Sequence, residues 1–314
     1  MPRRVEDVQV GDAPSLATLV GRLEAGGGFS AKGVADGTHL LARILADAEM
    51  TTFLSFTADI VATGTRGVLA ELVHDGFVDA IITTCGTLDH DLARAFKPYY
   101  HGEWTLDDAD LRRRHLYRLG NLVIPEASYG TIIERKMRPI LEHLWTEGTR
   151  SLSTVALARA IGASLPASAG ETSILRAAYD RNVPVIVPGI TDGAVGSQAW
   201  LFWQDHRGLS FDLFSDEQLL SDLVFGAKRS GAIMLGGGIS KHHTIWWNQF
   251  RDGLDAALYL TTAVEWDGSL SGARTREAIS WGKLKPNARH TTVEGDVTLL
   301  FPLMVGAALE RLRR

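Results

Sequence analysis

One feature constrains the fold of this chain most: a short apolar run that ends in three consecutive glycines. Residues 232–235 are apolar, Gly236 to Gly238 follow, and residues 241–251 have the length and apolar spacing of a helix. A glycine lets a ligand approach the backbone closely, and a helix N-terminus offers N–H groups to an anion. The pattern predicts a strand that leads into a phosphate-binding turn, although an ordinary turn has the same composition.

The rest of the chain predicts an α/β fold, because apolar runs of strand length alternate with segments of helical spacing. We expect a Rossmann-like, mostly parallel sheet flanked by helices. Pro139 is expected to kink or split one helix, and Ser215 with Gln218 resembles a capping box. Strands are predicted at 51–56, 78–83, 183–187, 209–213 and 256–260, and helices at 15–24, 34–48, 64–74, 129–145, 153–161, 192–203, 215–228 and 297–309.

Composition excludes several classes of protein. The chain has 314 residues, of which 45% are hydrophobic, so it can bury a large core. A net charge of −5 gives no basic surface for nucleic acid, and no apolar run reaches the length of a membrane span. The one cysteine, Cys85, cannot form an intramolecular disulfide and fits a reducing compartment. We therefore expect a cytoplasmic protein without a nucleic-acid or membrane partner.

Lys283 is the strongest candidate for chemistry in the sequence. Trp281 and Gly282 precede it, which favours burial of the lysine. A desolvated lysine loses its proton more easily and its neutral amine attacks carbonyls and imines. The alternative from the residues alone is a solvated surface lysine, which is the commoner case.

Histidine and tryptophan side chains also cluster near this lysine in the sequence. His242 and His243 are adjacent, so on a helix they point in different directions and cannot easily share a metal, and we predict no metal site. His242 could move a proton near neutral pH, or it could lie on a helix surface. Trp246 and Trp281 could attract an alkylammonium group through their ring faces, or they could pack in the core.

Two acids follow the predicted strand at 78–83. Asp89 and Asp91 come after its carboxyl end, where open α/β sheets place their ligands. Acids are also favoured in the first turn of a helix, and the sequence leaves both interpretations open.

Seven segments of the chain closely resemble the deoxyhypusine synthase family. The most specific motifs are SWGK, which ends at Lys283, and EWDGSLSGAR, which begins at Glu265. The resemblance implies that Lys283 is the lysine that forms an imine with the substrate. The matching segments are 51–67, 78–104, 117–125, 183–197, 234–243, 265–283 and 298–305.

The resemblance also implies an NAD site. Ala58 and Asp59 stand where the family usually has Ser or Gly followed by Asn, so the agreement is weaker there. Residues 1–50 are expected to form an N-terminal helical extension, and residues 51–314 the NAD-binding catalytic domain. The implied cofactor-binding residues are Ala58, Asp59, Thr84, Cys85, Gly86, Asp192, Gly237, Gly238, Thr262, Ala263 and Asp296.

The implied polyamine site departs further from the family. A glutamate is expected at His90, aspartates at Ser197 and Leu270, and an asparagine at Trp246. Each lost carboxylate removes a partner for a substrate ammonium, so the substrate looks altered. Lys283, His242, Glu277 and Trp281 keep their family identities, so the chemistry looks retained. The implied catalytic residues are Lys283 and His242, and the implied substrate-binding residues are Glu277, Trp281, Asp89, His90, Ser197, Trp246, Gly268 and Ser269.

In the family, NAD oxidises spermidine, the lysine captures the butylamine fragment, and a lysine of a translation initiation factor precursor accepts it. The resemblance predicts this activity in a homotetramer. A homospermidine-forming enzyme with a small amine acceptor, and an NAD-binding protein without turnover, remain as alternatives.

Overall fold

The computed structural model describes residues 3–313. The chain divides into two compact units. Unit 1 contains Met1–Phe56, Phe77–Ile82 and Leu219–Arg314, and unit 2 contains Thr57–Gly76 and Thr83–Gln218.

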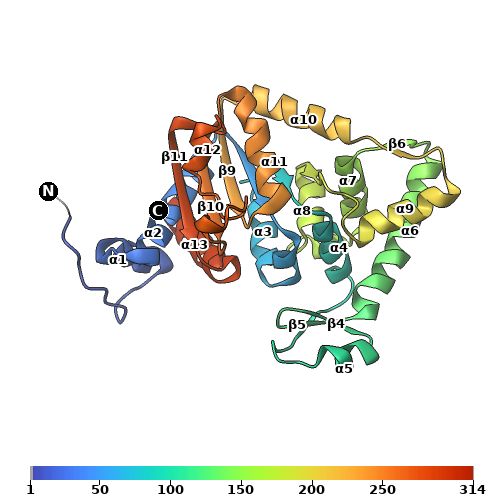
Figure 1. Ribbon diagram of the computed structural model, residues 1–314, viewed down its shortest axis with the longest axis horizontal. Coiled ribbons are helices and arrows are strands. Elements are labelled where there is room, and N and C mark those ends of the chain that lie inside the picture. The colour runs from blue at the N-terminus through green and yellow to red at the C-terminus, as the bar shows by residue number, and fades with distance from the viewer. Residues whose placement is uncertain (1–2, 314) are drawn as a thin grey trace. The chain divides into compact units, whose positions relative to one another are not determined.

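Unit 1 is built on parallel strands in the order β11-β10-β9-β1-β2. Leu54 pairs with Ile233, which pairs in turn with Leu258, and all three are fully buried. Strands covered on both faces need such continuous apolar runs. Figure 1 shows β9, β10 and β11 side by side. The strands are β1 (Met50–Phe56), β2 (Ala80–Ile82), β9 (Arg229–Leu235), β10 (Leu254–Thr261) and β11 (Leu284–Glu294).

Helices cover the sheet of unit 1. Helix α2 packs against α13 and against β10 and β11, and α11 packs against β1, β2 and β9. A Cβ at Gly37 of α2 would lie 2.7 Å from a Val293 methyl carbon, so this glycine allows α2 to approach β11 closely. The helical elements are α1 (Leu16–Gly26), α2 (Phe29–Ala46), α11 (Gly238–Asn248), η4 (Gln249–Arg251), η5 (Glu265–Asp267), α12 (Glu277–Ser280) and α13 (Val297–Leu312).

A buried ion pair ties three helices of unit 2 together. Asp91 on α4 accepts hydrogen bonds from Arg66 Nε on α3, and from Ser173 Oγ and Leu175 N at the start of α8, at 2.5–2.7 Å. These contacts give Asp91 a structural role. The helical elements are η1 (Ala58–Ala62), α3 (Thr65–His74), α4 (Cys85–Arg94), α5 (Asp108–Arg113), η2 (Glu126–Ser128), α6 (Gly130–Thr146), α7 (Thr154–Ser164), η3 (Ala167–Ala169), α8 (Ile174–Arg181) and α9 (Ala194–Asp205).

The strands of unit 2 are short. An antiparallel sheet β3-β5-β4 lies beside α5, β6 pairs with β8, and β7 follows α8. Helix α10 (Leu213–Gly226) contains the boundary between the units. The strands are β3 (Tyr100–His101), β4 (Leu116–Leu119), β5 (Leu122–Pro125), β6 (Ser151–Leu152), β7 (Val185–Ile186) and β8 (Ser210–Phe211).

The predicted α/β class with a mainly parallel sheet is confirmed. Helix α6 is continuous through Pro139, so of the kink or split predicted there the split does not occur; the helix buries Ile133 and Met137 on one face, and that packing outweighs one lost backbone bond. Two other local predictions were wrong. Helix α10 begins at Leu213 instead of at Ser215, and the Asp212 carboxylate accepts the Ser215 N–H at 3.0 Å. Helix α11 begins at Gly238 and so includes the last glycine of the turn.

No helix in the described residues 3–313 is long and apolar enough to cross a membrane.

Candidate active site

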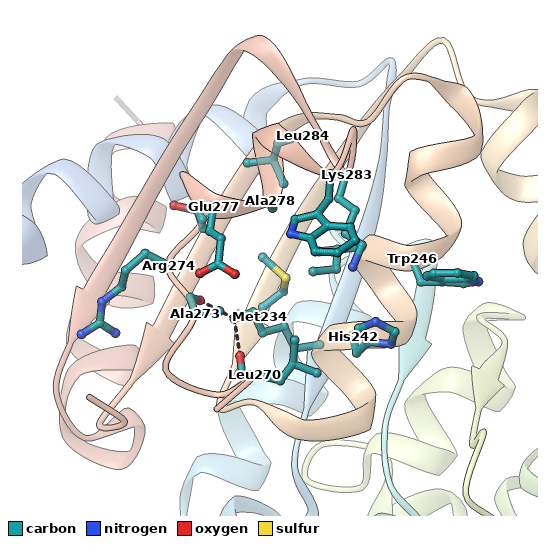
Figure 2. A pocket seen from close by; sticks show the side chains of 14 residues that line it. Met234, His242, Trp246, Leu270, Ala273, Arg274, Glu277, Ala278, Lys283 and Leu284 are labelled. Atoms are coloured by element: carbon teal, nitrogen blue, oxygen red, sulfur yellow. Dashed lines mark hydrogen bonds between the residues drawn. The ribbon is translucent and has the colours of Figure 1, made fainter. Parts of the chain in front are cut away.

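A pocket of about 310 Å³ lies in unit 1, where α11, α12 and the segment between β10 and α12 meet the ends of β9 and β11. Figure 2 shows the labelled lining residues, in which the Glu277 and Lys283 side chains point toward Met234 and the Arg274 guanidinium points away from it. Most of the lining is apolar, and the charged groups are two lysines, one arginine and one glutamate. The lining residues are Met234, Lys241, His242, Ile245, Trp246, Leu270, Ala273, Arg274, Thr275, Glu277, Ala278, Trp281, Lys283 and Leu284.

Lys283 lies buried in this pocket and is 8% exposed. Gly282 before it has φ of +68°, which turns the chain sharply after α12. The backbone N–H of Lys283 donates to Ala278 O at 2.9 Å, which holds the backbone of Lys283 against α12. Its Nζ lies 5.8 Å from the Trp246 ring centroid and 5.4 Å from that of Trp281. An amine between two indole faces lies where an alkylammonium substrate is also attracted.

His242 lies one turn before Trp246 on α11, and the two rings stack with centroids 5.7 Å apart. Burial lowers the pKa of the His242 imidazole, and the charge of Lys283 lowers it further. The ring is therefore uncharged near neutral pH and can accept a proton.

Glu277 begins α12 and is the one carboxylate among the described residues that line the pocket. In Figure 2 the Glu277 carboxylate and the Lys283 amine stand on either side of Met234. The pocket thus holds one carboxylate and one lysine amine, with the apolar side chain of Met234 between them. An aliphatic amine with an ammonium end fits this arrangement.

Lys241 also lines the pocket, although it was not among the site residues predicted from the sequence. Lys241 is 3% exposed, because the carbonyl groups of Leu270 and Ala273 and the ring of Tyr259 surround its ammonium. Burial above all, together with the charges of Arg274 and Lys283, lowers the pKa of the Lys241 ammonium to about 8, while Glu277 opposes the shift. In the sequence, only the adjacent His242 could have pointed to Lys241 as a site residue, because a lysine in a helix is usually exposed.

This pKa predicts a pH dependence of stability. Between about pH 8 and pH 10.5 the folded chain releases the Lys241 proton while the unfolded chain keeps it. The unfolded state then binds more protons, so the free energy of unfolding rises with pH across this window. We expect the parent to gain stability relative to Lys241→Met between pH 7 and pH 9.5 in urea denaturation. A difference in stability that stays constant with pH would contradict this assignment.

Five predicted cofactor-binding residues lie in unit 1, just after the carboxyl ends of three neighbouring parallel strands. Gly237 and Gly238 follow β9, Thr262 and Ala263 follow β10, and Asp296 follows β11. They therefore share one edge of the sheet, which is where α/β proteins bind nucleotides. The first turn of α11 carries no acid, so its N-terminus suits a phosphate. These residues fit a dinucleotide.

Gly237 has a second reason to be glycine. A Cβ there would lie 2.5 Å from the Ser271 Cα and closer still to its hydroxyl. Close packing against the chain itself therefore requires the glycine, apart from any ligand. Gly238 has φ of +67° and open space where a Cβ would be, and its N–H donates to Ser271 Oγ at 3.2 Å.

The other predicted cofactor-binding residues lie in unit 2. Thr84 Oγ1 accepts the Ala58 N–H at 3.2 Å, and a Cβ at Gly86 would lie 2.9 Å from the Ala58 Cβ. Asp59 and Asp192 are exposed. Cys85 is fully buried, and burial raises the pKa of its thiol to about 12, so it packs as an unreactive side chain. Apart from Cys85, this group offers polar and backbone atoms that suit a nucleotide.

Three predicted substrate-binding residues also lie in unit 2. Asp89 is fully buried, and its carboxylate accepts hydrogen bonds from Tyr129 Oη, Ala194 N and Val195 N at 2.7–2.8 Å. It thereby caps α9. The His90 Nδ1 lies 2.9 Å from Tyr99 Oη, and burial lowers its pKa to about 4. His90 is uncharged at neutral pH and cannot replace the carboxylate expected there.

Ser197 and two residues near η5 complete the predicted substrate set. Ser197 is exposed on α9 and donates from Oγ to Gly193 O at 3.0 Å. Gly268 has φ of +72°, and the Ser269 N–H donates to Asp267 Oδ1 at 2.7 Å. These two shape the turn before Leu270 and do not line the pocket. Their substrate roles stay predictions.

The sequence matches the family model for deoxyhypusine synthase over residues 18–308. The chain belongs to the deoxyhypusine synthase family. A relative from Picrophilus torridus, named as a probable deoxyhypusine synthase, is 49% identical over 98% of this chain and 97% of its own length. One from Ignicoccus hospitalis with the same name is 47% identical over 99% of this chain and 97% of its own length.

A crystal structure assigned to a deoxyhypusine synthase of Entamoeba histolytica shares the fold. Its TM-score is 0.63 at 19% identity, with 98% of this chain and 96% of that chain covered. Members of the deoxyhypusine synthase family are transferases that use NAD to move an aminobutyl group from spermidine to a lysine of a translation factor precursor. In residues 3–313 no three metal-ligating side chains cluster as a metal site would require.

Proposed function

We propose that this deoxyhypusine synthase family member takes an aminobutyl-type fragment from spermidine or a related amine and carries it as an imine on Lys283. The acceptor is a lysine of a translation initiation factor precursor. The observation that supports the proposal best is the placement of the buried Lys283 amine between two indole faces, in a pocket whose one carboxylate is Glu277.

The residues of the pocket divide the work. Bound NAD would supply the chemistry of a hydride acceptor at the donor carbon next to a nitrogen, and then that of a hydride donor to the product. The Lys283 amine adds to the oxidised carbon, the bond from that carbon to the donor nitrogen breaks, and the remainder of the donor leaves as an amine. The acceptor amine then adds to the same carbon and releases Lys283. His242 takes and returns protons at its imidazole, Glu277 holds the ammonium end, and Trp281 forms a wall.

NAD would be held by the residues after β9, β10 and β11, with Asp296 as a candidate acceptor for ribose hydroxyls. The residues after β1, β2 and β7 are proposed as further cofactor contacts. Residues 1–50 are proposed as an N-terminal extension and 51–314 as the catalytic domain. We also propose a homotetramer that works in the cytoplasm, which fits the single buried cysteine.

A scan of amine donors tests the proposal. The purified protein is mixed with NAD and with spermidine, putrescine or agmatine, and NADH is followed by absorbance. Spermidine or a close analogue should give NADH that depends on the amine. Absence of NADH with every amine, while NAD still binds, would favour the alternative of an NAD-binding protein without turnover.

The acceptor has a second candidate, a small diamine, which would make the protein a homospermidine synthase-like enzyme. Leu270 and Trp246 support this second candidate acceptor. Both line the pocket, at positions where the family resemblance implies an aspartate and an asparagine. Product analysis with putrescine and with the factor precursor decides between the two acceptors.

Leu270 predicts weak binding of spermidine. One lost charge-assisted hydrogen bond costs about 1.5–3 kcal/mol. Leu270→Asp should therefore lower the KM for spermidine about tenfold or more. Leu270→Asn, which has nearly the same size without the charge, serves as the control. Equal KM values for Leu270→Asp and the parent would show that other groups bind this ammonium.

A further inference from the structure

Lys241 makes contacts that the proposed reaction does not use. Its Nζ donates to Leu270 O at 2.9 Å and to Ala273 O at 2.6 Å, and these bonds are the dashed lines in Figure 2. The same ammonium lies 3.8 Å from the Tyr259 ring centroid. A buried ammonium with two carbonyl acceptors and an aromatic face is well satisfied.

The two carbonyl groups belong to residues 268–274, which we call the wall segment. Its residues Leu270, Ala273 and Arg274 line the pocket. The segment has no regular secondary structure, so its position depends on bonds to its neighbours. Lys241 supplies two of them from α11.

Strand β10 holds the middle of the wall segment. Tyr259 Oη donates to Ser271 O at 2.5 Å, and Thr261 Oγ1 donates to the same oxygen at 3.2 Å. Lys241 bonds the residues on either side of this point, at 270 and 273. The hydroxyl groups of β10 and the ammonium of α11 thus fix the segment together.

We propose that Lys241 is a positioning residue: by holding the carbonyls of Leu270 and Ala273 it fixes the wall against which the amine donor lies beside Lys283. The inference rests on the proposed function for its effect on turnover. It assigns different tasks to the two pocket lysines. Lys241 uses its N–H groups on backbone oxygens, whereas in the described part of the chain no hydrogen bond is found for the Lys283 amine.

The charged groups around Lys241 support a positioning role. Glu277 on α12, Arg274 in the wall segment and Lys283, which follows α12, are the charged groups that shift the pKa of Lys241. The Arg274 guanidinium is itself bound to Glu294 at 2.7 Å and to Ala263 O at 3.1 Å. Arg274 is thus held by β11 and by the residues after β10. From α11, the Lys241 side chain links to the wall segment at residues 270 and 273, and the Gly238 N–H links to Ser271 Oγ.

Two measurements on Lys241→Met test the proposal. Hydrogen exchange of peptides that cover the wall segment should become faster by about tenfold or more, because two of its anchoring bonds are lost. The KM for the amine donor should rise by about tenfold or more. NAD affinity, measured by calorimetry, should stay within about twofold. Lys228→Met, which removes an exposed lysine that pairs with Glu49, should behave as the parent in all three.

Two further variants keep the test decisive. Lys241→Arg retains charge and donors and should recover part of the KM. Tyr259→Phe removes only the hydroxyl that holds Ser271 O, and should raise the KM in the same direction even if Lys241→Met does not fold. Borohydride trapping should place the substrate adduct on Lys283 in the parent and never on Lys241.

The outcomes separate the two proposals. An active parent whose KM for the amine is unchanged in Lys241→Met or Tyr259→Phe would overturn the role of Lys241. A parent that makes no adduct with any amine would instead overturn the proposed function, and exchange of the wall segment would still decide whether Lys241 fixes it.

Discussion

Replacing Lys283 by arginine is expected to abolish product formation while NAD binding persists. Arginine keeps the positive charge near the two indole rings, but its guanidinium remains protonated and cannot add to a carbon. We expect turnover to fall by about a thousandfold or more, because an essential nucleophile is lost. The measurement is product formation with NAD and the best donor from the amine scan.

The matched control is Lys228→Arg, which makes the same exchange at an exposed position. It should retain parental turnover. Circular dichroism and NAD titration establish that the Lys283 variant is folded. If Lys283→Arg turns over normally, the covalent mechanism is wrong.

Glu277→Gln is expected to give the second largest effect, on the binding of the amine. Glu277 is the one acidic group among the described residues of the pocket, whose other charged groups are Lys241, Lys283 and Arg274. Removing its charge loses a charge-assisted hydrogen bond worth about 1.5–3 kcal/mol, or about 10- to 150-fold in the KM for a cationic donor.

The NAD affinity of the Glu277 variant should not change, and the exposed Glu134→Gln on α6 serves as its control. The effect should also shrink at high salt, since part of it is electrostatic. An unchanged KM for the donor in Glu277→Gln would place the ammonium site elsewhere.

The sequence was most informative about the buried strands. Strands β1, β9 and β10 have long apolar stretches because neighbours cover them, and the predicted segments 51–56, 232–235 and 256–260 lie within them, although β9 begins three residues earlier than predicted. Strand β11, at the end of the sheet order, was missed. Its sequence LKPNARHTTVE is polar and includes Pro286, which an edge strand tolerates and a central strand does not. Edge strands lack the pattern on which such predictions depend.

The site was predictable where a short motif carries it. Lys283, Trp281 and Glu277 lie within seven residues of one another, and the structure places them around one pocket together with His242 and Trp246. Lys241 was missed because its burial arises from the wall segment, about 30 residues further along the chain. Asp89 has its oxygens directed at the start of α9, which local sequence cannot reveal.

The central claim is that Lys283 carries the substrate fragment, and trapping the imine tests it most directly. The protein is incubated with NAD and spermidine, reduced with borohydride, digested and examined by mass spectrometry. The account predicts a butylamine-sized mass increase on the peptide that contains Lys283, which depends on both NAD and the amine. An adduct confined to another lysine, or none with a donor that demonstrably reduces NAD, would contradict it.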